Sequence, residues 1–314
     1  MRFGIMAMQM KELIPAGLSP QEMMGYITSF ENATLVCKLH AHGFSLIELG
    51  GDLSMFMPQT FAPPAIERLA ALKAELGLAY TVHLPLWSVE PSTPLTPVRH
   101  GSARALIDVV QATVSLEPEA YVLHATGALA AEFYRMKLPE LGRAMLMRQF
   151  QGGAMESIHA ILSETGIPSR QLAIETIEFP LDLTLEMAEK FDLSICLDVG
   201  HVLSGFSGDV EFFDALELIL PRMAEIHLHD SPVPASQQEI VYGKDHSVLG
   251  TGDLDISRFL DRLTEAQFNG PIIFELEIEE ALASLDVIRA IRPEVWKGGG
   301  SRAGATTPAR SSTS

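Results

Sequence analysis

Short runs of apolar residues alternate along the chain with longer segments in which apolar residues recur every three or four positions. The short runs are apolar on both faces except at their last positions, which is typical of buried parallel strands. Eight segments fit this description: Phe3–Ala7, Leu46–Leu49, Tyr80–Leu84, Tyr121–His124, Leu172–Thr176, Ser194–Asp198, Glu225–Leu228 and Ile272–Leu276. The pattern therefore predicts strands that are covered on both sides.

The longer segments predict helices between these strands. Pro64–Leu76 places its leucines on one stripe, and Gly77 follows as a C-cap. The other predicted helices are Ser102–Leu116, Leu141–Glu164, Leu183–Lys190, Val210–Leu220, Ile256–Ala266 and Glu280–Ile291, with helical segments near Pro20–Phe30 and Ala33–His42. Because Leu141–Glu164 contains Gly152-Gly153, it is expected to form one helix or two.

Eight strands that alternate with helices predict an α/β fold, a (β/α)8 TIM barrel, as a single domain over residues 1–293. A doubly wound open sheet is the alternative, but that fold usually has a glycine-rich turn after its first strand. This chain reads MAMQMKEL there, without glycine. The segment 297–314 is rich in Gly, Ser and Thr and has no apolar periodicity, so we expect a disordered C-terminal tail.

Charge and cysteine usage narrow the possible partners and location. The chain has 22 Lys and Arg against 40 Asp and Glu, a formal net charge of −18. This balance disfavours DNA and anionic membrane surfaces as partners. Cys37 and Cys196 match no zinc or redox motif, so both are expected to be buried reduced thiols. With no signal peptide or membrane span in the sequence, we expect a cytoplasmic location.

Histidines and carboxylates recur at the carboxyl ends of successive predicted strands. The candidates are His83, His124, Glu175, Asp198, His201, His227 and Glu275, with His246 in the loop after the seventh strand. In a TIM barrel these ends meet at one mouth, where active sites lie. Imidazole and carboxylate together suit zinc, manganese or cobalt better than calcium or magnesium. No Lys or Arg stands at these strand ends to pair with the acids, which further favours a metal site.

The local spacing of the candidates gives some of them different roles. Asp198 and His201 are three residues apart where the chain starts to turn, so both can reach one site. His227 and His229 lie on the same side of a strand, and either His229 or Asp230 is expected to orient a ligand. In the loop that contains His246, the glycines are expected to form an ordinary turn, before a helix whose N-cap is Asp253 or Asp255.

These segments resemble the xylose isomerase-like TIM barrel superfamily, also called the AP endonuclease family 2 superfamily. The segments HLP, VLHATG, IET, LDVGH, IHLHDS and DHSVLGTGDLD appear in the family's order, and the resemblance covers residues 1–293. Each segment is weak evidence alone, but the ordered set is specific. Two branches of the superfamily imply different chemistry.

The endonuclease IV-like branch holds three zinc ions and hydrolyses phosphodiesters. Resemblance to it implies a first metal on His83, His124 and Glu175, and a second on Glu175, Asp198, His227 and Glu275. The third would need His201, His246 and an aspartate two residues before His246. Lys244 occupies that position and Asp245 is displaced by one, so we expect two ions rather than three.

The sugar isomerase and epimerase branch uses one metal. By resemblance that metal would lie on Glu175, Asp198, His227 and Glu275. The two glutamates would also act as acid and base, and His201 would contact the substrate.

The extra histidines favour a zinc-dependent phosphoester hydrolase, with catalytic roles for Glu175, Glu275 and His201 and with manganese or cobalt as alternative metals. We expect a small or medium-sized substrate, nucleotide-like or of the cobamide type cleaved by one branch of the superfamily, rather than DNA. The Met- and Phe-rich segment 52–61 and Trp87 would suit a substrate with an apolar part, or they simply pack. A one-metal sugar or sugar-phosphate isomerase or epimerase, a DNA-repair endonuclease and a non-catalytic metal-binding module are the alternatives, and the oligomeric state is left open.

Overall fold

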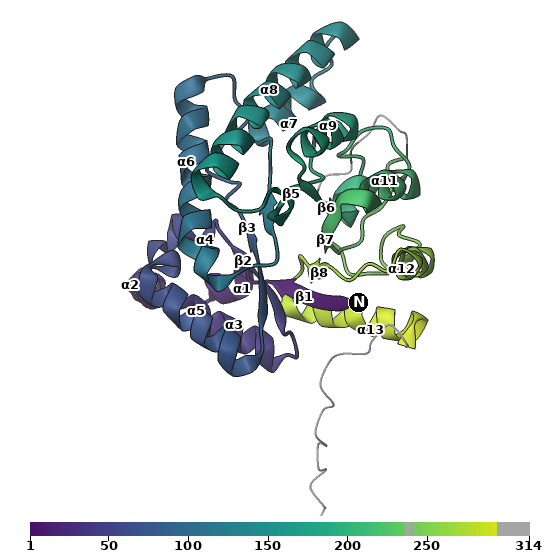
Figure 1. Ribbon diagram of the computed structural model, residues 1–314. Coiled ribbons are helices and arrows are strands. Elements are labelled where there is room, and N and C mark those ends of the chain that lie inside the picture. Colours follow the sequence, from purple (N-terminus) through teal and green to yellow (C-terminus); the bar gives the residue numbers. More distant parts are fainter. Residues whose placement is uncertain (236–239, 241–242, 294–314) are drawn as a thin grey trace, which may run out of the picture.

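The computed structural model describes residues 1–235, 240 and 243–293. Within them, parallel strands follow one another around a closed barrel, and the last strand pairs with the first (Figure 1). The strands are β1 Arg2–Met6, β2 Leu46–Gly50, β3 Ala79–His83, β4 Tyr121–Leu123, β5 Leu172–Glu175, β6 Ser194–Asp198, β7 Met223–His227 and β8 Pro271–Phe274. The predicted single-domain (β/α)8 barrel is confirmed, because closure excludes an open doubly wound sheet.

Helices surround the barrel and cover the outward faces of its strands (Figure 1). They are α1 Met10–Leu13, α2 Pro20–Ser29, α3 Asn32–Ala41, α4 Leu53–Phe56, α5 Pro63–Leu76, α6 Thr96–Thr113, α7 Ala128–Arg135, α8 Glu140–Thr165, α9 Leu181–Phe191, α10 Val199–Leu203, α11 Phe212–Ile219, α12 Ile256–Glu265 and α13 Ile278–Ile291. Short 3-10 turns cover Pro58–Phe61, Val114–Leu116, Ser169–Gln171 and Leu220–Arg222. Asp255 is the N-cap of α12 and accepts a hydrogen bond from the Arg258 amide. None of the helices in this described part is long and apolar enough to cross a membrane.

Two further details concern α8 and Cys37. Of the two possibilities left open for the glycine pair, the structure has one helix, because α8 runs unbroken through Gly152 and Gly153. A Cβ on Gly153 would collide with the carbonyl oxygen of Ser92 in the β3–α6 loop. Cys37 is exposed, since it lies on the outer side of α3, whereas Cys196 is buried as expected.

The inside of the barrel is less apolar than the strand pattern predicted. Glu48 on β2, Thr81 on β3 and Glu225 on β7 are all fully buried. Because side chains alternate along a strand, Thr81 and Glu225 lie one layer below His83 and His227, which end the same strands. The prediction that strand interiors are apolar on both faces is therefore wrong at these positions. The expected tail at 297–314 lies outside the described residues.

Candidate metal centre

Glu175, the last residue of β5, occupies the centre of the site and is buried. Its Oε2 lies 3.1 Å from Nε2 of His83 and 2.9 Å from Nε2 of His124. Its Oε1 lies 3.4 Å from Nδ1 of His201 and 3.6 Å from Nδ1 of His227. The two oxygens of one carboxylate thus face two different sets of imidazoles.

The first set, His83, His124 and Glu175, offers one ligand atom from each residue within 4.8 Å of the others. His83 ends β3, and His124 directly follows β4. Nδ1 of His83 lies 2.9 Å from the carbonyl oxygen of Leu84, which fixes the ring and leaves Nε2 directed at Glu175. We call these residues the first group.

The second group consists of Glu175, Asp198, His227 and Glu275, again with ligand atoms within 4.8 Å of one another. His227 is fully buried, and its Nδ1 lies 3.3 Å from Oε1 of Glu275. That nitrogen has no hydrogen-bond partner in the described chain. A buried, unpaired nitrogen that faces three carboxylates is a position that a cation would satisfy.

Asp198 and His201 converge because a helix starts between them. Asp198 ends β6 and is the N-cap of α10, and its Oδ1 accepts a hydrogen bond of 2.7 Å from the His201 amide. This cap turns His201 back toward the mouth, so that its Nδ1 lies 3.3 Å from Oδ2 of Asp198. The same carboxylate therefore both starts the helix and contributes to the site.

A third group, Asp198, His201, His229 and His246, also has ligand atoms within 4.8 Å of one another. Asp245 lies beside it, with Oδ2 3.1 Å from Nδ1 of His246 and 3.6 Å from Nε2 of His201. The one-residue displacement in the sequence therefore does not keep this aspartate away from the site. Lys244 is exposed, and its carbonyl oxygen accepts a hydrogen bond from Ser247.

His229 and Asp230 have different roles in the structure. His229 contacts the site, with Nε2 2.9 Å from Oδ2 of Asp198, and its ring stacks on His246 at 4.1 Å. Asp230 instead accepts hydrogen bonds from the backbone amides of the loop that follows His246. These donors are Gly250, Gly252 and Leu254, together with Ser231. Asp230 thus fixes the loop that carries His246.

Glu48 is a contributor that the strand-end pattern missed. Its Oε1 lies 3.3 Å from Nε2 of His227, the ring nitrogen that faces away from the second group. Thr81 donates a hydrogen bond of 3.0 Å to Glu48, and the carboxyl of Glu225 also contacts Glu48. A charged residue inside the otherwise apolar run LIELG was the available signal, but the pattern alone gave it no partner.

The imidazoles and the carboxylates of the site shift one another's pKa values. Burial alone would raise the pKa of Glu175, but the charges of His124 and His227 hold that pKa well below its usual value. Burial lowers the pKa of His83, but its contact with Glu175 outweighs this and raises the pKa to about 9. Burial also lowers the pKa of His246. Its contacts with Asp245 and Glu275 outweigh this effect and raise the pKa to about 11.

The spacing of these atoms fits transition-metal ligands. Around a tetrahedral zinc ion with ligands at about 2.0–2.1 Å, neighbouring ligand atoms lie ~3.3 Å apart. The contacts between Glu175 and its four imidazoles span 2.9 to 3.6 Å. Mixed imidazole and carboxylate ligands also suit zinc, manganese or cobalt. The residues of the first group and those of the second group would each fit a divalent ion.

Two cavities open onto this centre. One, of about 440 Å³, is bordered by His83, His124, Glu175, His201 and Glu275, together with residues of the β1, β3 and β8 loops. The other, of about 490 Å³, lies on the side of the β4 and β5 loops. Trp87 borders both. Neither lining contains Lys or Arg among the described residues.

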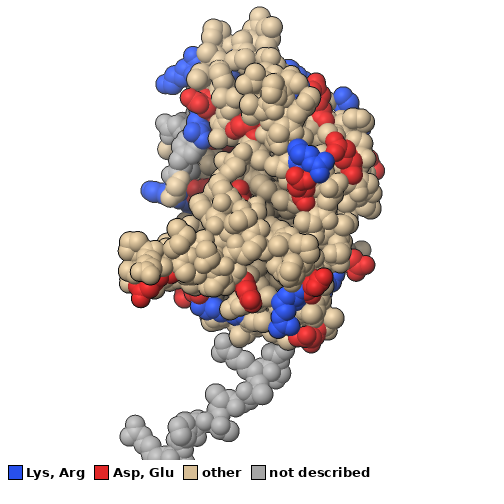
Figure 2. Space-filling model, turned by 90° about the vertical axis from the view of Figure 1, so that its left-hand side faces the viewer, with Lys and Arg blue, Asp and Glu red and all other residues tan. Residues whose placement is uncertain are grey.

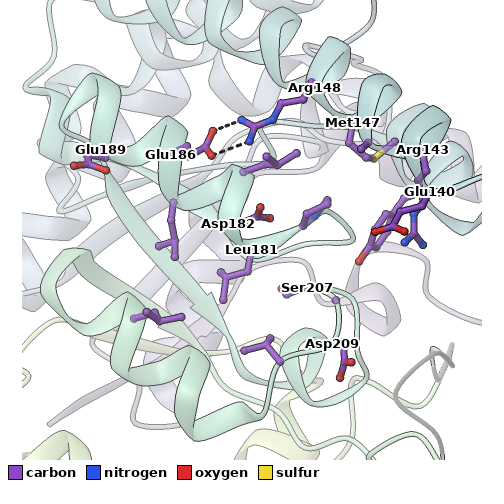
Figure 3. Close-up of a pocket in the computed structure, with 18 residues that line it drawn as sticks. Glu140, Arg143, Met147, Arg148, Leu181, Asp182, Glu186, Glu189, Ser207 and Asp209 are labelled. Carbon is purple, nitrogen blue, oxygen red and sulfur yellow. Dashed lines mark hydrogen bonds and ion pairs between the residues drawn. The ribbon is translucent and has the colours of Figure 1, made fainter.

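A separate hollow of about 770 Å³ lies between α8, α9 and the segment after α10 (Figure 3). Arg148 points toward Glu186 there and forms an ion pair with it. No histidine lines this hollow within the described chain, and none of its residues belongs to the three groups. The chemistry of the site is therefore concentrated at the mouth of the barrel.

Comparison with known proteins agrees with this architecture. The model of the family described as xylose isomerase-like TIM barrel matches residues 36–293. The chain belongs to this family. An uncharacterised protein of Methanocaldococcus jannaschii is 22% identical over 260 residues, which cover 80% of this chain and 82% of the relative.

Solved structures that share this fold include enzymes of two kinds. A D-tagatose 3-epimerase-like protein superposes with a TM-score of 0.66 and 20% identity, covering 94% of this chain and 100% of that one. Endonuclease IV from Thermus thermophilus superposes with a TM-score of 0.62 and 19% identity over the same shares. At these identities the likeness shows the shared fold, and the reaction must be argued from the site.

Proposed function

We propose that this protein is a divalent-metal-dependent hydrolase, zinc being the preferred ion, that cleaves a phosphoester in a small or medium-sized substrate. The arrangement of Glu175 carries the proposal, because each of its oxygens faces a separate set of imidazoles. A carboxylate so placed can bridge two ions. A one-metal site would leave the first group without a function.

Two bound ions would supply Lewis acidity that activates water and offsets the charge on phosphoryl oxygens. The protein's own groups would then position the reactants around the phosphorus atom. Glu275 borders the cavity and would accept a hydrogen bond from the attacking water, which orients the water for attack. His201 borders both cavities and would donate a hydrogen bond to the departing oxygen. Glu175 holds the two halves of the centre in register.

A small substrate is supported by the charge around the mouth. The chain carries a net charge of −18, and the described linings of both cavities contain no Lys or Arg. A duplex-binding enzyme needs cations that neutralise several phosphates. We therefore favour a nucleotide-like or cobamide-type phosphodiester over DNA.

A sugar isomerase or epimerase is the second candidate. Glu175 and Glu275 belong to one group with Asp198 and His227, the set that one metal and an acid–base pair of glutamates would need. Epimerases are among the structures that share this fold. This chemistry does not require His83 or His124, which is where the two proposals separate.

The discriminating experiment removes one imidazole of the first group. Protein purified without added metal is analysed for bound metals, and hydrolysis of bis(p-nitrophenyl) phosphate is measured. We expect two zinc ions per chain in the native protein. In His124→Ala we expect one ion fewer and hydrolysis lower by about a hundredfold. His159→Ala, which changes an exposed histidine of α8, is the matched control and should behave as the native protein.

The outcomes separate the candidates. Unchanged hydrolysis in His124→Ala contradicts the hydrolase proposal and its metal assignment. A single exchangeable manganese or cobalt ion, with ketose epimerisation that survives His124→Ala, supports the second candidate. A protein that binds no divalent metal contradicts both.

A further inference from the structure

Two large aromatic side chains stand half exposed at the mouth of the barrel. Trp87, in the loop after β3, is 52% exposed, and Phe56, at the end of α4, is 54% exposed. Their rings meet edge to face, with centroids 6.3 Å apart and planes at 71°. We call Phe56 and Trp87 the aromatic pair. Exposed aromatic surface beside a catalytic cavity is typical of a ligand contact.

A buried carboxylate fixes the backbone of this pair. Asp52, just after β2, accepts hydrogen bonds of 2.9 Å from the Leu86 amide and 3.2 Å from the Trp87 amide. Ser88, the next residue, contacts the sulfur of Met55 in α4 at 2.7 Å. The β2 and β3 loops are therefore tied together, and Trp87 is held in place before any ligand arrives.

The cavity beside Trp87 has an apolar wall. Met6, Met8, Met10, Leu86 and Leu276 are among the residues that line it. Outside the three groups, its charged lining residues are the acidic Asp52, Glu277 and Glu280, and no described lining residue is Lys or Arg. Uncharged residues also make up most of the side of the molecule that carries α2 (Figure 2). This wall suits a neutral, flat apolar group and disfavours further phosphates.

We propose that Trp87, which Phe56 packs against, and the methionine-lined wall bind an aromatic group of the substrate, on the half of a phosphodiester that does not react. The proposal rests on the proposed function for the position of the phosphate, which lies over the histidines and carboxylates. Trp87 is then a specificity-determining residue, and Asp52 is a positioning residue that acts through it.

The test compares two substrates that share a leaving group. Bis(p-nitrophenyl) phosphate and methyl p-nitrophenyl phosphate both release p-nitrophenol, but only the first keeps an aromatic group on the retained half. Using the zinc-loaded full chain, we expect Trp87→Ala to raise KM for the first substrate roughly tenfold, with kcat nearly unchanged. KM for the methyl ester should not change, and Trp87→Phe should restore most of the loss.

Two further variants check the role of Asp52 and the specificity of the effect. Asp52→Ala should raise KM for the aromatic diester several-fold and increase amide exchange at Leu86 and Trp87, a readout that loss of activity alone would not give. Leu218→Ala changes a residue of α11 that is 56% exposed and lines the separate hollow. It should leave both KM values as they are.

Direct binding distinguishes failure of this inference from failure of the proposed function. In Trp296→Phe, where Trp87 is the sole tryptophan, bis(p-nitrophenyl) phosphate should quench the fluorescence at concentrations where dimethyl phosphate does not. Quenching without hydrolysis would leave the aromatic site standing and contradict the hydrolase. Hydrolysis with equal KM values for the two esters, or equal effects of Trp87→Ala on both, would overturn the aromatic site.

Discussion

Two sets of buried carboxylates lie inside the same barrel, one layer apart, and have different surroundings. At the mouth, Glu175 contacts four imidazoles. Below it, Glu48 and Glu225 have the hydroxyl of Thr81 and one nitrogen of His227 within reach. All three glutamates are almost inaccessible to solvent, so burial alone does not distinguish them.

The difference appears in their protonation. Burial and then the charge of Glu48 raise the pKa of Glu225 well above its usual value. The pKa of Glu175, in contrast, is held well below its usual value by its imidazoles. The surrounding imidazoles thus favour the charged form of a buried carboxylate, the form that can bind a metal, whereas a neighbouring carboxylate favours the neutral form.

The largest effect is expected when a glutamate is replaced by glutamine in each layer. Glu175→Gln keeps the shape of the side chain but removes the charge that two ions would share. We expect metal content to fall from two ions to at most one, and hydrolysis to fall by about a thousandfold or more. Elemental analysis and initial rates measure both effects.

Glu225→Gln is the matched control for that change. Because burial and Glu48 raise the pKa of Glu225 and so favour its neutral form, glutamine is a close mimic of it, and both metal content and rate should stay close to native values. Equal losses of metal and activity in Glu175→Gln and Glu225→Gln would contradict the proposed difference between the two layers.

A smaller effect should distinguish Glu48 from Glu225, the two glutamates below the mouth. Glu48 accepts a hydrogen bond from Nε2 of His227 and leaves Nδ1 for the second group, whereas Glu225 forms no hydrogen bond with a histidine nitrogen of the described residues. Glu48→Leu should weaken zinc binding by about 10–100-fold, the range known for partners that orient a ligand imidazole. Glu225→Leu should not, and competition with a chelator measures both affinities.

Thermal unfolding of the metal-free variants provides the control for folding. Leucine removes a buried carboxyl group in both cases, so neither variant should be markedly less stable than the native chain. If zinc binding falls only in proportion to a lost Tm, Glu48 has a structural role and does not position His227.

Strand-end residues were predictable from sequence because chain geometry alone places them. A run such as AYTVHLP marks a strand and its end, and parallel strands of a closed barrel present all their ends at one mouth. His83, Asp198 and His227 needed no knowledge of side-chain contacts to be placed at that mouth. The Asp198–His201 spacing was informative for the same reason, since it is local.

The lower layer and the aromatic pair could not be predicted in this way. Glu48 and His227 are separated by 179 positions along the chain and meet across the barrel. Asp52 and Trp87 come from different loops, and only the folded structure shows that one holds the other. Asp245 is a residue for which sequence spacing was misleading. It is displaced by one position from the expected aspartate, yet it contacts both His201 and His246.

The smallest expected effect is a change of stability with pH, because protons can bind the histidines at the mouth when metal is removed. The folded pKa of His83 is raised to about 9 from an unfolded value of 6.5. Its proton therefore contributes stability that is fully present below pH 6.5 and is lost as the pH rises through 9. Between these limits we expect the chelator-treated protein to lose on the order of 2–3 kcal/mol, a decrease of several degrees in Tm. Zinc-loaded protein should respond in the opposite sense, because acid returns protons to the imidazoles and expels the metal.

A metal-free protein whose Tm is flat from pH 6.5 to 9 would show that the imidazoles of the mouth are neutral without metal, and the contrast with Glu225 would then rest on geometry alone.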